Sequence, residues 1–142
     1  MLNGGPISWK SRRQDRVSLS TSKAEFVAAS QAGQETICLR ETLNDFRFSP
    51  TLATPLYEDN LTCVAMSENP VRRKFFRHSD IRKYYVLELV LAVFLKLVPL
   101  RTHEMVAGAL TKSLPSPAFI RHSQIMTGHA SFAARLLRCV RG

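Results

Sequence analysis

The sequence has few cysteines, few acidic residues and no long apolar run. Its three cysteines, Cys38, Cys63 and Cys139, lie far apart and form no Cys-x-x-Cys pair. An odd and scattered set argues against a disulfide framework and against a zinc site, and it is typical of a reducing compartment. We therefore expect a cytoplasmic or nuclear location.

The lack of a long apolar run argues against a membrane protein. The N-terminal residues MLNGGPISWKSRR have no apolar core of signal-peptide length. The most apolar stretch, residues 84–100, is interrupted by Glu88, Lys96 and Pro99, whereas a spanning helix needs about 20 apolar residues. This stretch is interpreted as buried protein core, and no membrane partner is expected.

Acidic residues are outnumbered by basic ones. Eleven Asp and Glu against 20 Lys and Arg give a net charge of +9 in a chain of 142 residues. A chain of this length can bury most of its apolar side chains in one core. The positive charge favours a polyanionic partner such as nucleic acid, although a basic protein need not have one.

Strands alternate with helices along the chain. Apolar patterning and turn residues predict strands over residues 6–10, 52–57 and 93–98, and helices over about 20–45, 61–67, 80–91, 104–111 and 118–126. Gly33 is a possible break in the first helix, and Gly128 ends the last one. The order predicts an α/β fold with a mixed or parallel sheet flanked by helices. We place this domain over residues 1–128 and a basic extension without an assigned role over 129–142.

Two carboxylates stand at places where such a fold could bring them together. Glu25 lies near the start of the first helix, and Asp59 follows a predicted strand. Carboxylates at such places can hold metal ions that activate water at a phosphodiester, and Mg²⁺ or Mn²⁺ suits oxygen ligands. Each also has a structural alternative, because Glu25 can form a capping box with Ser22 and Asp59 can cap the next helix with Asn60. Spacing alone favours these structural alternatives.

A basic loop precedes the helix expected at 80–91. It holds Phe75 and Phe76 among its cations, and so combines phosphate-neutralising charge with faces on which bases can stack. The residues expected to contact nucleic acid are Arg72, Arg73, Lys74, Arg77, His78 and Arg82. The structural alternative is a solvated basic face with the two phenylalanines in the core. Binding through this loop would be independent of sequence and strongly dependent on salt.

Several blocks of the sequence resemble, in order, the ribonuclease H domain of copia-type LTR retrotransposon Pol polyproteins. The first block is ISWKSRRQDRVSLSTSKAEFVAAS at residues 7–30, where that family reads roughly I-S-W-x-S-K-K-Q-x-x-V-x-L-S-S-T-E-A-E-Y-x-A. The later blocks are YEDN at 57–60, NPV at 69–71, RHSDIR at 77–82 and VAGALTK at 106–112. Together they cover about residues 3–126, so the resemblance is far more specific than any single motif.

The resemblance implies a ribonuclease H-like fold that binds an RNA–DNA hybrid and hydrolyses its RNA strand with four carboxylates and two Mg²⁺ (or Mn²⁺) ions. Glu25 matches the helix carboxylate and Asp59 the second-strand carboxylate of that family, so both are the expected catalytic and metal-binding residues. Gly108 stands where the last Asp is expected, and Lys23 replaces an acid beside Glu25. The first carboxylate would belong to a strand before residue 1, so we expect a fold that is incomplete at its N-terminus. With two of four ligands absent, we expect impaired metal binding and little or no hydrolysis.

Three other interpretations stay open at this point. The chain could be a fragment of an active reverse transcriptase/ribonuclease H polyprotein, whose remainder would then be its partner. It could instead be a non-catalytic basic protein that binds RNA or DNA. It could also be a remnant without a function that folds poorly.

Overall fold

The computed structural model describes residues 6–11, 21–68 and 81–129, without the side chains of residues 21 and 22. The chain divides into two compact units. We call Gln14–Leu100 the sheet unit, and Met1–Arg13 together with Arg101–Gly142 the second unit. Five of the six residues expected to contact nucleic acid lie outside the described residues: Arg72, Arg73, Lys74, Arg77 and His78.

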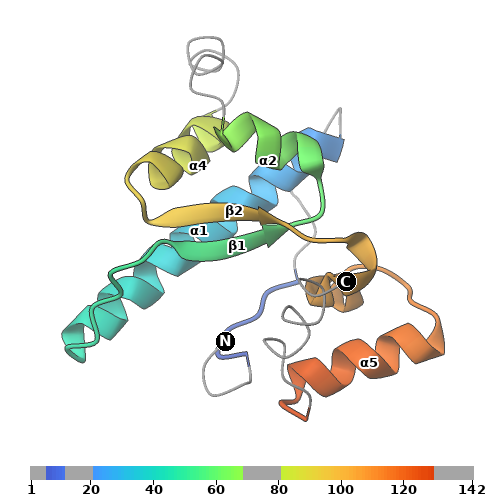
Figure 1. The fold of residues 1–142 in the computed structure, drawn as a ribbon. Helices are drawn as coiled ribbons and strands as arrows, with labels where there is room; N and C mark the ends of the chain where they lie inside the picture. The colour runs from blue at the N-terminus through green and yellow to red at the C-terminus, as the bar shows by residue number, and fades with distance from the viewer. Residues whose placement is uncertain (1–5, 12–20, 69–80, 130–142) are drawn as a thin grey trace, which may run out of the picture. The chain divides into compact units, whose positions relative to one another are not determined.

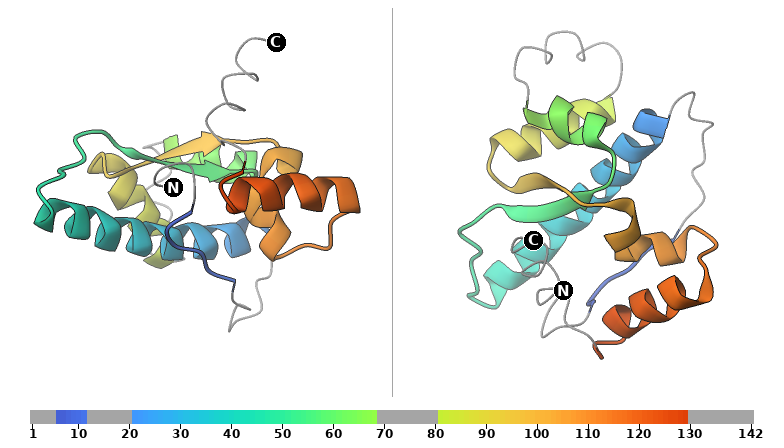
Figure 2. Two further views of the ribbon diagram at one scale, coloured as in Figure 1. Left: turned by 90° about the horizontal axis from the view of Figure 1, so that it is seen from below. Right: turned by 45° about the vertical axis from the view of Figure 1, so that its right-hand side comes forward.

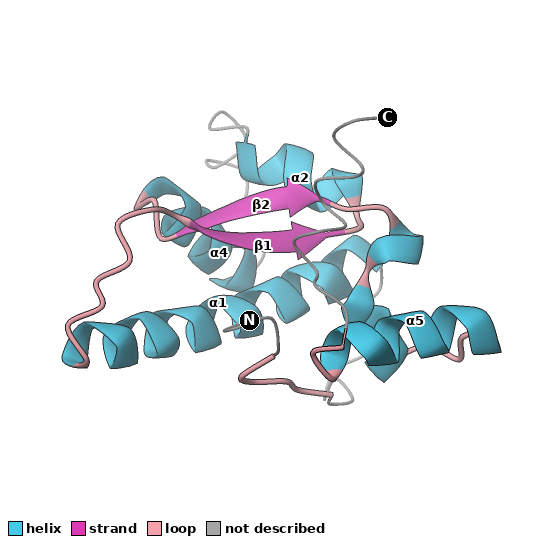
Figure 3. Cartoon of the chain, turned by 60° about the horizontal axis from the view of Figure 1, so that its bottom comes forward, coloured by secondary structure: helices cyan, strands magenta, loops and turns pink. Residues whose placement is uncertain are grey.

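Two parallel strands form the sheet of the sheet unit. Strand β1 spans Thr54–Glu58 and strand β2 spans Leu95–Pro99, and they run side by side in the same direction (Figure 3). Thr54 pairs with Leu95 and Glu58 with Pro99, so the strands are in step along their whole length. The predicted α/β class is confirmed, and the arrangement is consistent with an incomplete ribonuclease H-like fold.

Three helices pack on the sheet and on one another. They are α1 (Thr21–Asp45), α2 (Leu61–Glu68) and α4 (Ile81–Leu91). Helix α1 crosses behind the two strands in Figure 1 and stays on one side of them in both views of Figure 2. Because side chains alternate along a strand, Leu56, Leu95 and Leu97 share a face. The core cluster joins this face to the helices, and its buried members are Phe26, Ala29, Cys63, Val64, Val86 and Leu97.

Helix α1 runs through Gly33 without interruption, so the predicted break is wrong. A Cβ atom at residue 33 would lie 2.7 Å from Leu89 Cδ1 and 3.3 Å from Leu95 Cδ1. Glycine therefore lets α1 approach α4 and β2 more closely than any larger residue would. Close packing offsets the helix propensity that glycine lacks, which is roughly 1 kcal/mol relative to alanine.

At two helix ends, a residue other than glycine adopts the left-handed backbone conformation. After α4, Val93 has a φ of 60°, and after α1, Arg47 has a φ of 63°. At Val93 the backbone forms a Schellman motif, because Phe94 N donates to Leu89 O (3.0 Å) and Val93 N to Val90 O (3.2 Å). This motif explains how α4 ends three residues before β2 begins, although the sequence there offers neither glycine nor proline.

Short helical segments occupy much of residues 101–129 in the second unit. Two 3₁₀ turns, Thr102–Glu104 and Val106–Leu110, precede helix α5 (Ser116–Met126). The α-helix predicted over 104–111 is therefore wrong. Helix α5 ends at Met126 as predicted, and Gly128, two residues later, has a φ of 78°.

The strand predicted over residues 6–10 is also wrong, because residues 6–11 have no strand assignment. A strand needs a neighbour to satisfy its backbone donors and acceptors. Here Ile7 and Trp9 are 52% and 73% exposed, and the segment is tied to the 3₁₀ turn at 106–110 by Ser11 Oγ, which donates to Leu110 O at 3.0 Å. Within the described residues, no helix has both the length and the apolar character needed to cross a membrane.

Candidate metal-binding carboxylate cluster

Three carboxylates converge where β1 ends and α1 begins. Glu58 is the last residue of β1, Asp59 follows it, and Glu25 is the fifth residue of α1. Each offers one carboxylate oxygen, and these oxygens all lie within 4.8 Å of one another. We call these three residues the acidic cluster. Glu25 and Asp59, which were both predicted as site residues, are thus brought together.

The backbone turn after β1 positions the acidic cluster. Glu58 Oε1 accepts a hydrogen bond from Asn60 N at 3.0 Å. Asn60 Oδ1 in turn accepts hydrogen bonds from Thr62 N (3.0 Å) and Cys63 N (3.3 Å), which makes Asn60 the N-cap of α2. The sequence suggested that Asp59 and Asn60 together cap this helix, and the capping hydrogen bonds described here are made by Asn60. The capping box suggested for Glu25 involves Ser22, whose side chain lies outside the described residues.

Glu58 is the member of the acidic cluster that sequence reasoning missed. Its side chain is only 6% exposed, which is unusual for a carboxylate. Burial is the main cause that raises the pKa of Glu58; the hydrogen bond from Asn60 N opposes this, and the negative charges of Glu25 and Asp59 raise it further. The alternation of side chains along the strand could have predicted the burial of Glu58, because Glu58 lies on the same face of β1 as Leu56, which packs on the core.

The pKa of the buried Cys63 thiol is affected by charges of the acidic cluster. Cys63 is fully buried in the core. Its pKa is raised to about 12, mainly by burial and also by the negative charges of Glu58 and Glu25, while the positive charge of Lys83 opposes the rise. Such a thiol stays protonated at neutral pH, so it is neither a nucleophile nor a metal ligand. The local chemistry is therefore that of carboxylate oxygens.

The donor set of the acidic cluster suits a hard divalent cation. Three carboxylates at this separation repel one another. A cation between them would offset that repulsion, because its positive charge would balance their negative charges. Oxygen-only ligands are typical of Mg²⁺, Ca²⁺ and Mn²⁺ and not of zinc or copper. The residues present thus fit the Mg²⁺ or Mn²⁺ implied by the family resemblance, with Glu25, Glu58 and Asp59 as the residues that would hold it.

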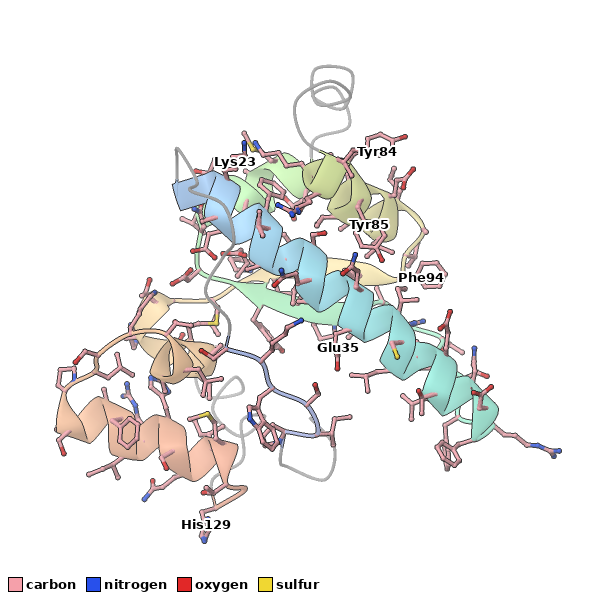
Figure 4. All side chains as sticks on the ribbon, turned by 180° about the vertical axis from the view of Figure 1, so that it is seen from behind. Lys23, Glu35, Tyr84, Tyr85, Phe94 and His129 are labelled. Atoms are coloured by element: carbon pink, nitrogen blue, oxygen red, sulfur yellow. The ribbon has the colours of Figure 1, made fainter. Side chains whose placement is uncertain are left out.

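The other predicted site residues have different outcomes. Arg82 is exposed on α4. Lys23 lies in the first turn of α1, labelled at the helix start in Figure 4; residues two apart on a helix do not face each other, so it does not share the face of Glu25. Gly108 is buried in the 3₁₀ turn of the second unit, where an added Cβ would meet nothing within 4 Å.

Comparison with known proteins shows which proteins the chain is similar to. It is 31% identical over 130 residues to the retrovirus-related Pol polyprotein from transposon TNT 1-94 of Nicotiana tabacum, which is 92% of this chain and 10% of that protein. Its homologues are retrovirus-related Pol polyproteins of plant transposons. Two others come from transposons RE1 and RE2 of Arabidopsis thaliana, at 29% identity over 83% of this chain and 27% over 87%, each covering 8% of the relative.

These homologues support the expected relation to retrotransposon Pol polyproteins. The chain spans about a tenth of the length of these relatives. No protein-family model matches the chain. No solved structure matches it either.

Proposed function

We propose that this chain is the remnant of a retrotransposon ribonuclease H domain that binds a divalent cation at its acidic cluster and contacts an RNA–DNA hybrid without hydrolysing it efficiently. The observation that carries the proposal is the convergence of Glu25, Glu58 and Asp59 within 4.8 Å. Two of these are the residues that the family resemblance matches to metal-binding carboxylates. The Pol polyprotein homologues support the same origin.

The cation would be held by side chains from two separate elements. Glu25 approaches from α1, while Glu58 and Asp59 come from the end of β1. Glu58 accepts a hydrogen bond from Asn60 N, which orients its carboxylate before any ion binds. A bound Mg²⁺ or Mn²⁺ would supply charge stabilisation and water activation at a phosphodiester.

Weak hydrolysis is expected because one ligand position of the family lacks a carboxylate. Gly108 replaces the last Asp of the V-A-D-x-L-T-K block, and glycine offers no side-chain oxygen. Two-metal catalysis depends on both ions lying in a defined geometry, so the loss of one ligand affects the rate more than it affects binding of a first ion. The hybrid would be bound through phosphate contacts, independently of sequence.

Mn²⁺ binding to the purified chain tests the metal site. Electron paramagnetic resonance of free Mn²⁺ should show saturable binding that is lost in Glu25→Gln and in Asp59→Asn. Glu41→Gln is the matched control, because Glu41 is exposed on the same helix as Glu25 and far along it. Binding that survives both cluster substitutions, or that is lost equally in the control, would overturn the metal assignment.

Hydrolysis of a labelled RNA–DNA hybrid in Mg²⁺ or Mn²⁺ tests the inactivity. The expected result is no cleavage above background, with hybrid binding that weakens steeply as salt rises. Cleavage that Glu25→Gln abolishes would refute the inactivity while supporting the metal site. A binding constant that does not change with salt would refute phosphate contact and with it the nucleic-acid part of the proposal.

A further inference from the structure

Two hydrogen bonds from different segments hold Glu58, the buried member of the acidic cluster. Its main-chain carbonyl oxygen accepts a hydrogen bond from Leu100 N at 2.9 Å, just after β2. Its side-chain Oε1 accepts a hydrogen bond from Asn60 N at 3.0 Å. The first bond ties the backbone of Glu58 to the sheet, whereas the second comes from the turn before α2 and bears on the direction of the carboxylate.

Asn60 is itself held in place by the start of α2. Its Oδ1 accepts hydrogen bonds from Thr62 N (3.0 Å) and Cys63 N (3.3 Å). Its main-chain carbonyl oxygen accepts hydrogen bonds from Cys63 N (2.9 Å) and Val64 N (3.3 Å). Cys63 and Val64 are buried members of the core cluster, so this first turn of α2 is anchored in the core. The side chain of Asn60 therefore fixes its own backbone, including the N–H group that donates to Glu58.

We propose that Asn60 is a positioning residue of the metal site, whose side chain orients the carboxylate of Glu58 by capping α2. The inference rests on the proposed function, because it concerns how that site holds its cation. Asn60 is not a ligand in this proposal, since its Oδ1 already accepts two hydrogen bonds from backbone N–H groups. A carboxylate that is oriented before the ion arrives loses less freedom on binding, so loss of the cap should weaken binding while all three carboxylates remain.

A purely structural role of Asn60 predicts a different pattern. If the cap only stabilised α2, any substitution that weakened α2 to the same degree would affect the metal site equally. Ala65 offers this comparison, because it is exposed in the middle of the same helix and lies away from the turn. Glycine at an exposed helix position and loss of an N-cap destabilise a helix by similar amounts.

Mn²⁺ titrations of the folded variants separate the two roles. Asn60→Ala loses the cap but keeps the N–H group, and it should bind Mn²⁺ about tenfold more weakly than the wild type. Asn60→Ser keeps a capping oxygen, so its affinity should stay within about twofold of the wild type. Ala65→Gly should also stay within about twofold, although its urea midpoint falls about as far as that of Asn60→Ala.

Three results of these titrations would overturn the proposal. They are wild-type affinity in Asn60→Ala, binding by Asn60→Ser that is as weak as that of Asn60→Ala, and equal weakening in Ala65→Gly. The last result would show that Asn60 matters only through the stability of α2.

Amide hydrogen exchange in EDTA separates this inference from the proposed function. The protection factor of the residue 60 N–H should be about fivefold lower in Asn60→Ala than in Asn60→Ser or Ala65→Gly, because its hydrogen bond to Glu58 opens more often without the cap. Equal protection in the three variants would refute the positioning role. If the wild type shows no Glu25-dependent Mn²⁺ binding, the proposed metal site fails, whereas these protection factors still decide whether the cap holds the carboxylate of Glu58.

Discussion

Removing the charge of Glu58 should stabilise the metal-free protein at neutral pH. Glu58 is 6% exposed and lies beside two other carboxylates. Its pKa is raised first by burial, so ionised Glu58 costs free energy in the folded state. Glutamine has the same shape, and its Oε1 can still accept the hydrogen bond from Asn60 N. We expect Glu58→Gln to increase the free energy of unfolding by about 1–2 kcal/mol at pH 7 in EDTA.

The pH dependence follows from the direction of the shift. Because the folded pKa of Glu58 is above its ordinary value of 4.5, the folded protein binds this proton more tightly than the unfolded chain does. The stability contributed by the protonated carboxyl is therefore fully present below the ordinary value and is lost as pH rises through the folded pKa. Wild type and Glu58→Gln should have similar stability at low pH and diverge as pH rises toward 7.

Thermal unfolding followed by circular dichroism measures both effects. In EDTA at pH 7, the midpoint of Glu58→Gln should exceed that of the wild type by about 3–8 °C, whereas Glu41→Gln, at an exposed position on α1, should change it little. Adding Mn²⁺ should stabilise the wild type more than Glu58→Gln, because an ion that binds only the folded state stabilises it. A Glu58→Gln protein that is less stable than wild type in EDTA at pH 7 would refute the reasoning.

Three further predictions concern packing, backbone strain and thiol reactivity. Gly33→Val should destabilise the fold by about 2 kcal/mol, because its Cβ would lie 2.7 Å from Leu89 Cδ1; urea unfolding measures this, and an unchanged midpoint would contradict it. Val93→Gly should raise the thermal midpoint, because glycine adopts the left-handed backbone conformation of residue 93 without strain. After the entropy cost of glycine is subtracted, the expected gain in the free energy of unfolding is about 1 kcal/mol. A lower midpoint would show that Val93 is not strained. Iodoacetamide at pH 8 should alkylate exposed Cys38 and spare Cys63, which is buried and has its pKa raised to about 12; mass spectrometry of native protein checks this, and rapid labelling of Cys63 would contradict its burial.

Local patterns in the sequence predicted most of the sheet unit. The helices and strands that became α1, β1, α2, α4 and β2 were expected within a few residues of their bounds, because apolar periodicity and turn residues act over short ranges. The same approach failed at residues 6–10 and 104–111. A strand depends on a partner that local sequence does not name. At residues 106–110, Gly108 lowers the α-helix propensity that Ala107 and Ala109 supply, so local sequence does not choose between 3₁₀ and α geometry.

The sequence by itself determined that Glu25 lies near the start of a helix and that Asp59 follows a strand, because both facts depend on neighbours in the chain. Only the tertiary structure decided that Glu58 joins them, since its burial depends on how α1 packs against the end of β1. The role of Gly33 could not be predicted for the same reason. Glycine is needed there because the side chains of Leu89 and Leu95, from distant segments, pack against the helix at this position. The placement of Lys83 over Phe26 likewise depends on α4 meeting α1, a contact between residues 57 positions apart that no local pattern encodes.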